Sequence, residues 1–480
     1  MTGQSPALAQ ERVESGQWIA LIGLLLASLM DLLQTQVILV AVPVIQQDLH
    51  ASPAVMQWAT AGYSLAFGLA LVPGGRIGDL IGRKRVFLLG TAGFVAMSLL
   101  AGLSVNGEML VVTRVVQGVV AGLMVPQVLT LIQVNFSGAG RARALGMMAG
   151  VPAVAGVCGP ILGGVIGDAD WFGLGWRPVF LINIPIGIIC VLMTAGMVRE
   201  SRSDDRRGLD LLGAVILAAG LLGLLYPLVQ GSKAGWPVWT YASLAAGVVI
   251  LVLFALYERG RARGGRATLV EPSLFKDPGF VGGMLVSMVV FASTSVFFIL
   301  ALFEQYALGF RPIETGLSFF PFPIGLMLGV GLAMRLVHTL GRKIVFAGNL
   351  IIAVGMAAMS LAVAYAGAHL TIWELVPGMV IAGFGMALAG MTVMTIALSK
   401  VPPDHAGSAS GAINTAFQIG PAIGIAIVGT VYYELVAGPG QQAAARQSLW
   451  WEAGLLVLAF LLTFLLPKGP IPKFEPSGAE

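Results

Sequence analysis

Long apolar runs recur along the whole 480-residue sequence, and they restrict the chain to very few folds. These runs approach the ~20 residues that an α-helix needs to cross ~30 Å of hydrocarbon. Hydrophobic residues make up 57% of the chain and charged residues 10%, whereas soluble domains carry about 25% charged residues. Because hydrocarbon offers no hydrogen-bond partner to an open backbone group, every crossing segment is expected to be helical. The sequence therefore predicts an all-α integral membrane protein.

Fourteen segments are long and apolar enough to be membrane spans. The longest polar connection covers about 258–278 and a second covers 199–208, and together they bracket a pair of helices. We therefore expect a six-helix bundle at 1–200, a two-helix insert at 201–263 and a second six-helix bundle at 264–480. The expected spans are 18–42, 54–74, 86–105, 109–132, 144–167, 178–198, 209–229, 240–257, 279–303, 315–336, 344–365, 374–398, 407–432 and 449–467.

The distribution of basic residues predicts the orientation of the chain. With the N-terminus inside, 22 of the 27 lysines and arginines fall on the cytoplasmic side, and Arg114 falls within a span. The positive-inside rule then places both termini in the cytoplasm. The formal net charge of +4 is small and its bases sit in short loops, so nucleic acid is not an expected partner. The bases expected on the opposite side are Arg177, Lys233, Arg311 and Arg446.

A charged, glycine-rich segment follows the second span. It reads Gly-Arg-Ile-Gly-Asp-Leu-Ile-Gly-Arg-Lys from Gly75 to Lys84, and Gly341-Arg342-Lys343 echoes its end in the later half. Gly75 and Gly78 would allow close helix approach. Asp79 is a lone acid among four bases, and it can face a helix N-terminus or a loop arginine. This contact would act as a cytoplasmic gate, formed by Gly75, Asp79, Gly82, Arg83 and Lys84. The alternative is that the bases only fix the topology.

Three further motifs lie in the fourth to sixth spans. Arg114 stands inside the run Leu110–Gly118, where an arginine costs ~2.5–3.5 kcal/mol on insertion scales. The fifth span reads Gly-Val-Cys-Gly-Pro-Ile-Leu-Gly-Gly from Gly156 to Gly164, and the sixth opens with Trp176-Arg177-Pro178. With these motifs, nearly the whole chain resembles the major facilitator superfamily, in particular its fourteen-span drug:proton antiporter branch.

This resemblance implies a major facilitator fold with fourteen transmembrane helices, arranged six plus two plus six. It implies a secondary active transporter that works by alternating access and exports small amphipathic molecules such as drugs, antibiotics or natural products. By this resemblance, Arg114 would influence the protonation of a nearby carboxylate. The alternative is that Arg114 has a structural role only and is held by backbone carbonyl groups. The glycine-rich fifth span resembles the branch's antiporter motif, expected to seal the two halves through Gly156, Gly159, Pro160, Gly163 and Gly164.

The first span departs from the family pattern, because Gln34 stands where an aspartate is usual and Leu39 where an asparagine is usual. Asp31 lies three residues earlier, hence on nearly the same helix face. It is the one acid that we place near the middle of any span, and we expect proton coupling to depend on Asp31 and Arg114. A purely structural pair is the alternative. Acids expected at outer, solvated span ends are Glu108, Glu304, Glu374, Glu434 and Glu452.

Polar and aromatic side chains within the spans are expected to line a central substrate chamber. The four histidines are scattered over loops, and neither a nucleophile with its base nor an ATP-binding loop is present, so an enzyme or an ATP-driven pump is not expected. The chain should be a multi-pass monomer of the cell (inner or plasma) membrane, in contact with the lipid bilayer. No cofactor is expected, since the proton gradient would supply the energy. The chamber candidates are Gln34, Tyr63, Gln117, Gln127, Asn183, Gln305, Asn414 and Gln418. For Tyr63 the alternative is a position at the membrane interface, since it lies toward the outer end of the second span.

Two other functions remain open at this stage. The missing aspartate at position 34 leaves room for a lipid or lipid-like exporter, or for a carrier that is not coupled to protons. A sensor or structural membrane protein would normally carry a sizeable soluble domain, and the longest loop here has only about twenty residues. Substrate-dependent efflux, measured with and without a protonophore, would separate these possibilities.

Overall fold

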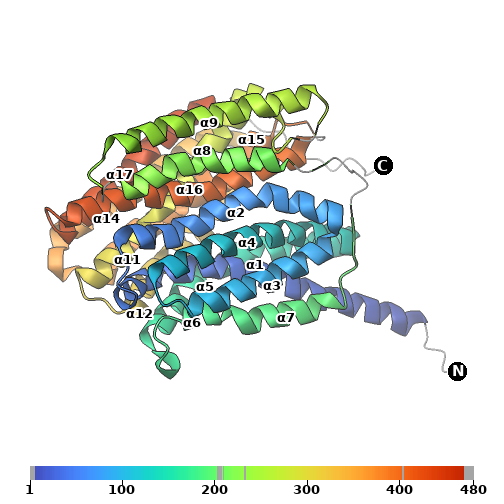
Figure 1. The fold of residues 1–480 in the computed structure, drawn as a ribbon, viewed down its shortest axis with the longest axis horizontal. Helices are drawn as coiled ribbons and strands as arrows, with labels where there is room; N and C mark the ends of the chain where they lie inside the picture. Colours follow the sequence, from blue (N-terminus) through green and yellow to red (C-terminus); the bar gives the residue numbers. More distant parts are fainter. Residues whose placement is uncertain are drawn as a thin grey trace. The chain divides into compact units, whose positions relative to one another are not determined.

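The computed structural model describes residues 6–202, 208, 210–231, 234–266, 268–402 and 405–469. Within these residues the regular structure consists of α-helices and short 3-10 helices, with no strand (Figure 1). Fourteen helical segments are long and apolar enough to cross a membrane, as the sequence predicted. The predicted orientation stays a prediction, and four of the bases behind it, Arg206, Arg207, Lys233 and Lys473, lie outside the described residues.

The chain divides into two compact units, Met1–Val215 and Ile216–Glu480. The three-part division at 201 and 263 stays a prediction. The helices of the first unit are α1 (Pro6–Asp48), α2 (Pro53–Ile81), α3 (Arg83–Gly102), α4 (Gly107–Asn135), α5 (Gly138–Asp168), η1 (Trp171–Gly173), α6 (Pro178–Leu181), α7 (Asn183–Ala195) and the first turn of α8 (Leu211–Gln230).

The second unit holds the rest of α8 and the later helices. Some of its membrane spans consist of two or more consecutive helices rather than one continuous helix. These are α9 (Val238–Arg263), η2 (Pro272–Lys276), α10 (Pro278–Ala292), η3 (Ser293–Ser295), α11 (Val296–Tyr306), α12 (Pro312–Phe319), α13 (Pro321–Leu340), α14 (Arg342–Ala366), η4 (Gly367–His369), α15 (Ile372–Leu398), α16 (Ala406–Val436), α17 (Gln441–Leu462) and η6 (Thr463–Leu465).

One glycine ends the second span of each predicted six-helix bundle. Gly82 separates α2 from α3 with φ +121°, and Gly341 separates α13 from α14 with φ +52°. L side chains rarely adopt positive φ, so a glycine at this point allows a sharp helix boundary at no steric cost. Both sequence motifs therefore end a helix at a glycine of positive φ, although ψ differs between them, at 125° for Gly82 and −132° for Gly341.

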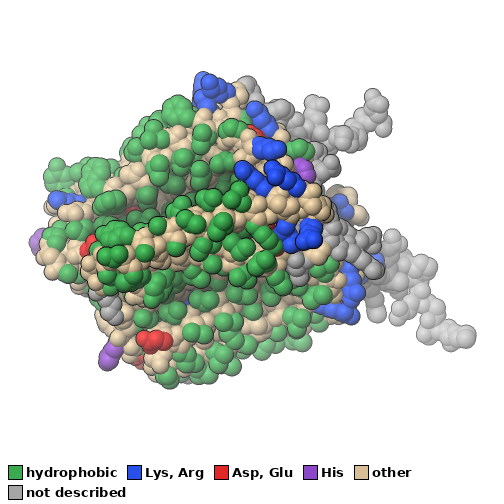
Figure 2. All heavy atoms as spheres, turned by 45° about the horizontal axis from the view of Figure 1, so that its top comes forward, with side chains coloured by type: hydrophobic (Ala, Val, Ile, Leu, Met, Phe, Trp, Pro, Cys, Tyr) green, Lys and Arg blue, Asp and Glu red, His purple; other side chains and the backbone are tan. Residues whose placement is uncertain are grey.

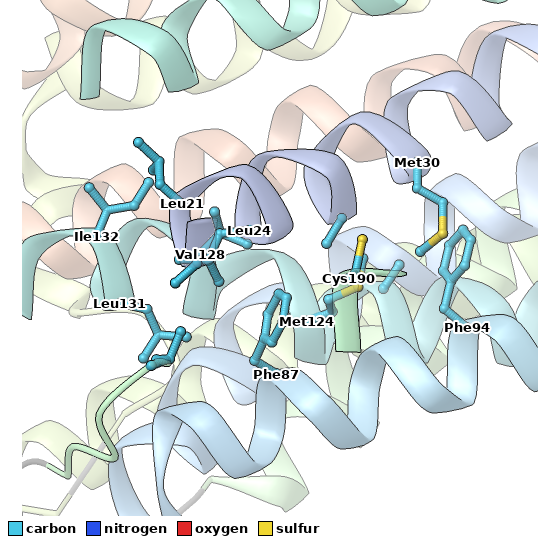
Figure 3. Packing of buried hydrophobic residues seen from close by; sticks show 14 of the residues in the cluster. Leu21, Leu24, Met30, Phe87, Phe94, Met124, Val128, Leu131, Ile132 and Cys190 are labelled. Carbon is cyan, nitrogen blue, oxygen red and sulfur yellow. The ribbon is translucent and has the colours of Figure 1, made fainter. Parts of the chain in front are cut away.

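The core of the first unit is apolar and closely packed (Figure 3). Leu24 of α1 lies beside Val128 of α4, Met30 of α1 lies beside Phe94 of α3, and all four are at most 1% exposed. Because lipid tails are as apolar as these side chains, their association in a membrane depends on close packing rather than on exclusion of water. Cys190 is a free thiol inside this core, which agrees with the packing role that its apolar setting suggests.

Hydrophobic side chains also cover the outside of the helices. The face shown in Figure 2 is mostly hydrophobic along the helix lengths, with charged side chains gathered at helix ends. On α9 alone, Val248, Val249, Val252, Leu253 and Leu256 are each more than half exposed. In water, an apolar face of this extent would promote aggregation, whereas lipid solvates it. The surface therefore agrees with a membrane protein.

Two acids contradict the expectation that acids at span ends are solvated. Glu304 and Glu452 are both 0% exposed, while Glu108, Glu374 and Glu434 are exposed as expected. Glu452 was placed at an outer end because the last span was predicted to begin at 449. The helix α17 actually begins at Gln441, so Glu452 lies near its middle. The statement that Asp31 is the one mid-span acid is therefore wrong.

Candidate functional site

A network of buried polar side chains joins three helices of the first unit. Asp31 comes from α1, Tyr63 from α2 and Arg114 from α4, and each is at most 2% exposed. The Tyr63 hydroxyl donates a hydrogen bond to the Asp31 carboxylate. The Arg114 guanidinium carbon lies 4.0 Å from the centroid of the Tyr63 ring. Tyr63 therefore stands between the acid and the base.

Helix packing explains why these side chains meet. A Cβ atom added to Gly118 of α4 would lie 2.4 Å from the backbone carbonyl oxygen of Tyr63. Glycine at this position lets α4 approach the α2 backbone closely, as small residues commonly do between membrane helices. Arg114 lies one turn before Gly118, so the same approach brings its guanidinium over the Tyr63 ring.

Arg114 is also held by neutral acceptors. Its Nε donates to the Ala59 carbonyl oxygen at 3.1 Å, and one terminal nitrogen donates to Oε1 of Gln117 at 2.6 Å. Gln117 passes the chain on, because its Nε2 donates to the Ser98 hydroxyl at 2.7 Å. The expected pairing of Arg114 with Asp31 is not a direct ion pair, since Tyr63 intervenes and a backbone carbonyl takes part.

The arrangement can store one negative charge at Asp31. In a low-dielectric interior, a carboxylate needs hydrogen bonds and a nearby cation to stay ionised, and Tyr63 and Arg114 supply them. A proton on Asp31 would weaken the hydrogen bond from Tyr63 and remove the electrostatic attraction between Asp31 and Arg114. Sequence reasoning left Tyr63 undecided between a membrane-interface position and the chamber. Its complete burial excludes the interface position, which no local sequence signal could have done.

Gln34 takes part in a separate contact of the first unit. Its Oε1 accepts a hydrogen bond of 2.5 Å from Nδ2 of Asn183, which joins α1 to α7. Nε2 of Gln34 has no hydrogen-bond partner within the described part of the chain, although the residue is only 1% exposed. Two adjacent turns of α1 thus carry two polar contacts, one to α2 through Asp31 and one to α7 through Gln34.

Gln127 lies away from this network. It follows Arg114 by thirteen residues on α4, a rise of about 20 Å. Its Nε2 donates to the Gly74 carbonyl oxygen at 2.9 Å, and its side chain fills the space beside Gly78. The structure therefore places this chamber candidate in the interface between α2 and α4, where it acts in packing.

The remaining chamber candidates belong to the second unit. Asn414 and Gln418 are one turn apart on α16, hence on one face, and both are partly buried. Nδ2 of Asn414 donates to the Ser410 carbonyl oxygen of its own helix at 2.9 Å. Gln305 on α11 is also partly buried. Their role in binding a substrate stays a prediction.

The predicted gate motif forms a compact charged corner between α2 and α3. Asp79 accepts hydrogen bonds from Arg83 at 2.8 and 3.0 Å, so the lone acid does meet a loop arginine. Close helix approach, expected of Gly75 and Gly78, belongs to Gly78, which abuts Gln127. At Gly75 an added Cβ would make only an ordinary contact at 3.7 Å, so that part of the prediction is wrong.

Glu200 completes this corner, and sequence reasoning missed it. Its carboxylate accepts hydrogen bonds from the backbone N–H groups of Lys84 at 3.0 Å and Arg85 at 3.2 Å. These are the free N–H groups at the start of α3, where a negative charge also suits the helix dipole. A Cβ atom on Gly82 would lie 2.7 Å from this carboxyl group. The sequence signal was a single acid directly after the sixth span.

The glycine-rich motif of the fifth span packs against α1 of the same unit. A Cβ atom on Gly159 would lie 2.5 Å from Cβ of Gln36, and one on Gly163 would lie 2.8 Å from the Val37 carbonyl oxygen. Pro160 and Gly164 are buried in the same helix. The motif therefore sets the close contact of α1 with α5, and the expected seal between the two halves stays a prediction.

Membrane-length helices that bury ionisable side chains among themselves are typical of polytopic membrane transporters. Charged groups inside membrane spans are costly, and they mark substrate or ion pathways in transporters. Residues 24–425 match the model of the Major Facilitator Superfamily, and the chain belongs to that family. Membership makes the protein a membrane transporter rather than an enzyme.

Curated relatives cover most of this chain. It is 39% identical to a probable actinorhodin transporter of Streptomyces coelicolor, over 89% of this chain and 74% of the relative. It is 35% identical to a cephamycin export protein of Amycolatopsis lactamdurans, over 92% and 91% of the two chains. It is 30% identical to a methylenomycin A resistance protein of Bacillus subtilis, over 94% and 96%.

A solved structure shows the same fold. It is a bacterial homologue of the human lysosomal transporter Spinster, in an inward-facing and unoccupied conformation. The TM-score is 0.63, the identity is 19%, and the match covers 96% of this chain and 98% of that one. At this identity the likeness concerns the fold alone.

Proposed function

We propose that this protein exports small amphipathic molecules, such as antibiotics or related natural products, across the bacterial plasma membrane. Three similar proteins are named for actinorhodin transport, cephamycin export and methylenomycin A resistance, and this supports the substrate class. The protein would work as a monomer in the bilayer, without a cofactor.

Exchange for protons is the proposed energy source, and the buried contact of Asp31 with Tyr63 carries this proposal. Among the described residues, the carboxylate has one neutral donor, and the Arg114 guanidinium lies over the aromatic ring of that donor. A proton taken up from outside would cancel the charge and weaken its hold on Tyr63 and Arg114. A ligand shifts a conformational equilibrium by its difference in affinity for the two states, and here the proton is that ligand.

A carrier that is not coupled to protons is the second candidate. Gln34 occupies the position where the family usually has an aspartate, and its amide oxygen is engaged by Asn183. A glutamine cannot exchange a proton at physiological pH. In this case Asp31 would be a structural residue and export would follow the substrate gradient alone. A related alternative is that the protein exports lipids or lipid-like molecules.

Efflux from cells that lack their own exporters tests both candidates. Cells expressing the protein should lose a fluorescent or radiolabelled antibiotic against its gradient, and a protonophore should stop this loss. Asp31→Asn should abolish uphill export at an unchanged amount of protein in the membrane. Glu108→Gln is the matched control, since Glu108 is an exposed acid of the same unit. Uphill export by Asp31→Asn at the wild-type rate would contradict the proton mechanism.

A further inference from the structure

A second buried acid lies in the second unit, far from the site described above in sequence. Glu452 is the twelfth residue of the 22-residue helix α17 and is 0% exposed. Its Oε1 accepts a hydrogen bond from the hydroxyl of Ser295, which ends the 3-10 turn η3 between α10 and α11. The contact therefore joins the middle of the last span to a break in the ninth.

The carboxyl group is poorly compensated for a buried ion. Within the described part of the chain, Ser295 is its one hydrogen-bond donor, Oε2 has no partner, and no basic side chain forms an ion pair with it. Ser448, one turn earlier on α17, is also 0% exposed and has an unpartnered hydroxyl. Burial of an ionised carboxylate without a cation costs several kcal/mol or more, so such a group carries a proton instead.

Ser295 differs from the other hydroxyl residues of its span. Ser287, Ser293 and Thr294 each donate to a carbonyl oxygen of their own helix, at 2.6 or 2.7 Å. Ser295 instead donates across to α17. The neighbouring helix α16 makes room at this break, because a Cβ atom on Gly424 would lie 2.8 Å from the Ser295 hydroxyl oxygen. The broken span thus presents one donor to one acid.

The pair also occupies a place equivalent to the Gln34–Asn183 contact of the first unit. Both contacts join the first and sixth spans of a six-helix bundle. Gln34 lies 48 residues before the motif glycine Gly82, and Ser295 lies 46 residues before Gly341. Asn183 lies 12 residues before the end of α7, and Glu452 lies 10 before the end of α17. In the first bundle, which lacks the family's usual aspartate, this contact joins the amides of Gln34 and Asn183. In the second bundle, the equivalent contact contains the acid Glu452.

No other charged group competes for this position among the described residues. The elements packed against α17 are α10, α11, α14, α16, η3 and η6, and α10, η3 and η6 carry no ionisable side chain. Glu304 follows Ser295 by nine residues on α11, about 13 Å along the helix. On the other packed elements and on α17 itself, no ionisable residue forms a hydrogen bond or ion pair with Glu452; these residues are Arg342, Lys343, Tyr365, Glu304, Tyr306, Tyr432, Tyr433, Glu434 and Arg446.

We propose that Glu452 is a second proton-binding site, which holds a proton on Oε2 while Ser295 donates to Oε1. The proton comes from the aqueous phase when the α10–η3–α11 break separates from α17, and it returns to water when that contact opens again. The use of this proton in transport rests on the proposed function, whereas its binding does not.

Infrared difference spectroscopy of the purified protein tests the binding directly, without a substrate. A protonated carboxylic acid gives a carbonyl stretching band that an ionised carboxylate lacks. At neutral pH the wild type should show such a band, Glu452→Gln should lose it, and Ser295→Ala should keep it at a higher frequency because the carbonyl loses its donor. Glu304→Gln is the matched control, since it removes another fully buried acid of the same unit and should leave this band in place.

Three results would overturn the proposal. The first is a band that persists unchanged in Glu452→Gln, with the variant eluting as a folded, monodisperse protein. The second is a band that is unaffected by Ser295→Ala. The third is a band that responds to sodium concentration at constant pH, which would identify a metal-cation site.

The role in coupling is measured separately, in proteoliposomes. Proton flux per exported molecule should fall by one proton in Glu452→Gln, while Asp31→Asn abolishes uphill export. Loss of the infrared band with an unchanged proton flux would confirm the binding site and reject its use in transport. An absence of substrate export in the wild type would count against the proposed function alone.

Discussion

The corner between α2 and α3 contains a glycine and a carboxylate that depend on each other. Gly82 has φ +121°, and a Cβ atom there would lie 2.7 Å from the carboxyl group of Glu200. Glu200 in turn accepts hydrogen bonds from the N–H groups of Lys84 and Arg85. Gly82→Ala should therefore have two effects at once, since it strains the backbone and displaces the cap of α3.

Each effect has an expected size. A residue other than glycine in the positive-φ region costs about 1–2 kcal/mol, and loss of an N-terminal cap costs about 0.5–2 kcal/mol. Glu200→Ala should then lower the free energy of unfolding by about 1 kcal/mol, and Gly82→Ala by about 2.5 kcal/mol. In the double variant the cap is lost once rather than twice, so the two changes should fall short of additivity by about 1 kcal/mol.

Reversible unfolding in mixed micelles, titrated with SDS, measures these free energies for the wild type, both single variants and the double variant. Glu200→Gln is the matched control, because it keeps one acceptor oxygen and should retain most of the stability. Additive effects within about 0.3 kcal/mol would show that an alanine at position 82 does not displace Glu200. The same result would remove the physical reason for a glycine at the end of this gate motif.

Two further substitutions test the interior of the first unit. Tyr63→Phe removes a hydrogen bond to the buried Asp31 carboxylate, a contact of about 1.5–3 kcal/mol, and should lower uphill export about tenfold or more at unchanged expression. Wild-type export would show that this hydrogen bond is dispensable. Gly159→Val should abolish export and lower thermal stability, because its side chain would overlap Gln36 of α1, whereas Gly150→Val of the same helix meets open space and should be tolerated. Equal behaviour of the two valine variants would argue against a close α1–α5 contact.

Some site contacts could be predicted because they are local in sequence. Asp79 and Arg83 are one helical turn apart, and their ion pair follows from that spacing. The cost of an arginine inside a span marks Arg114 as a candidate functional residue from the sequence alone. By contrast, the contact of Tyr63 with both Asp31 and Arg114 depends on the rotation of α4 and on its distance from α2. Neither quantity can be predicted from the sequence of a single helix.

The error at Glu452 has a simple physical cause. Gln441, Gln442, Arg446 and Gln447 lower the hydropathy of the first turns of α17, so the predicted span began eight residues too late. Hydropathy measures the average solvent of a segment, whereas burial of one side chain depends on its neighbours. Ser295 is the neighbour here, and it lies 157 residues away in the chain.

By itself, the sequence determined the class of this protein, the number and approximate place of its membrane spans, and its family. These properties follow from the apolar runs, because hydrocarbon tolerates only segments that satisfy their own backbone hydrogen bonds. Only the tertiary structure decided which polar side chains are buried and which partner each one has. Asp31 and Glu452 acquire their chemistry from hydroxyl groups on other helices, and a pairing between distant segments is fixed by packing rather than by local composition.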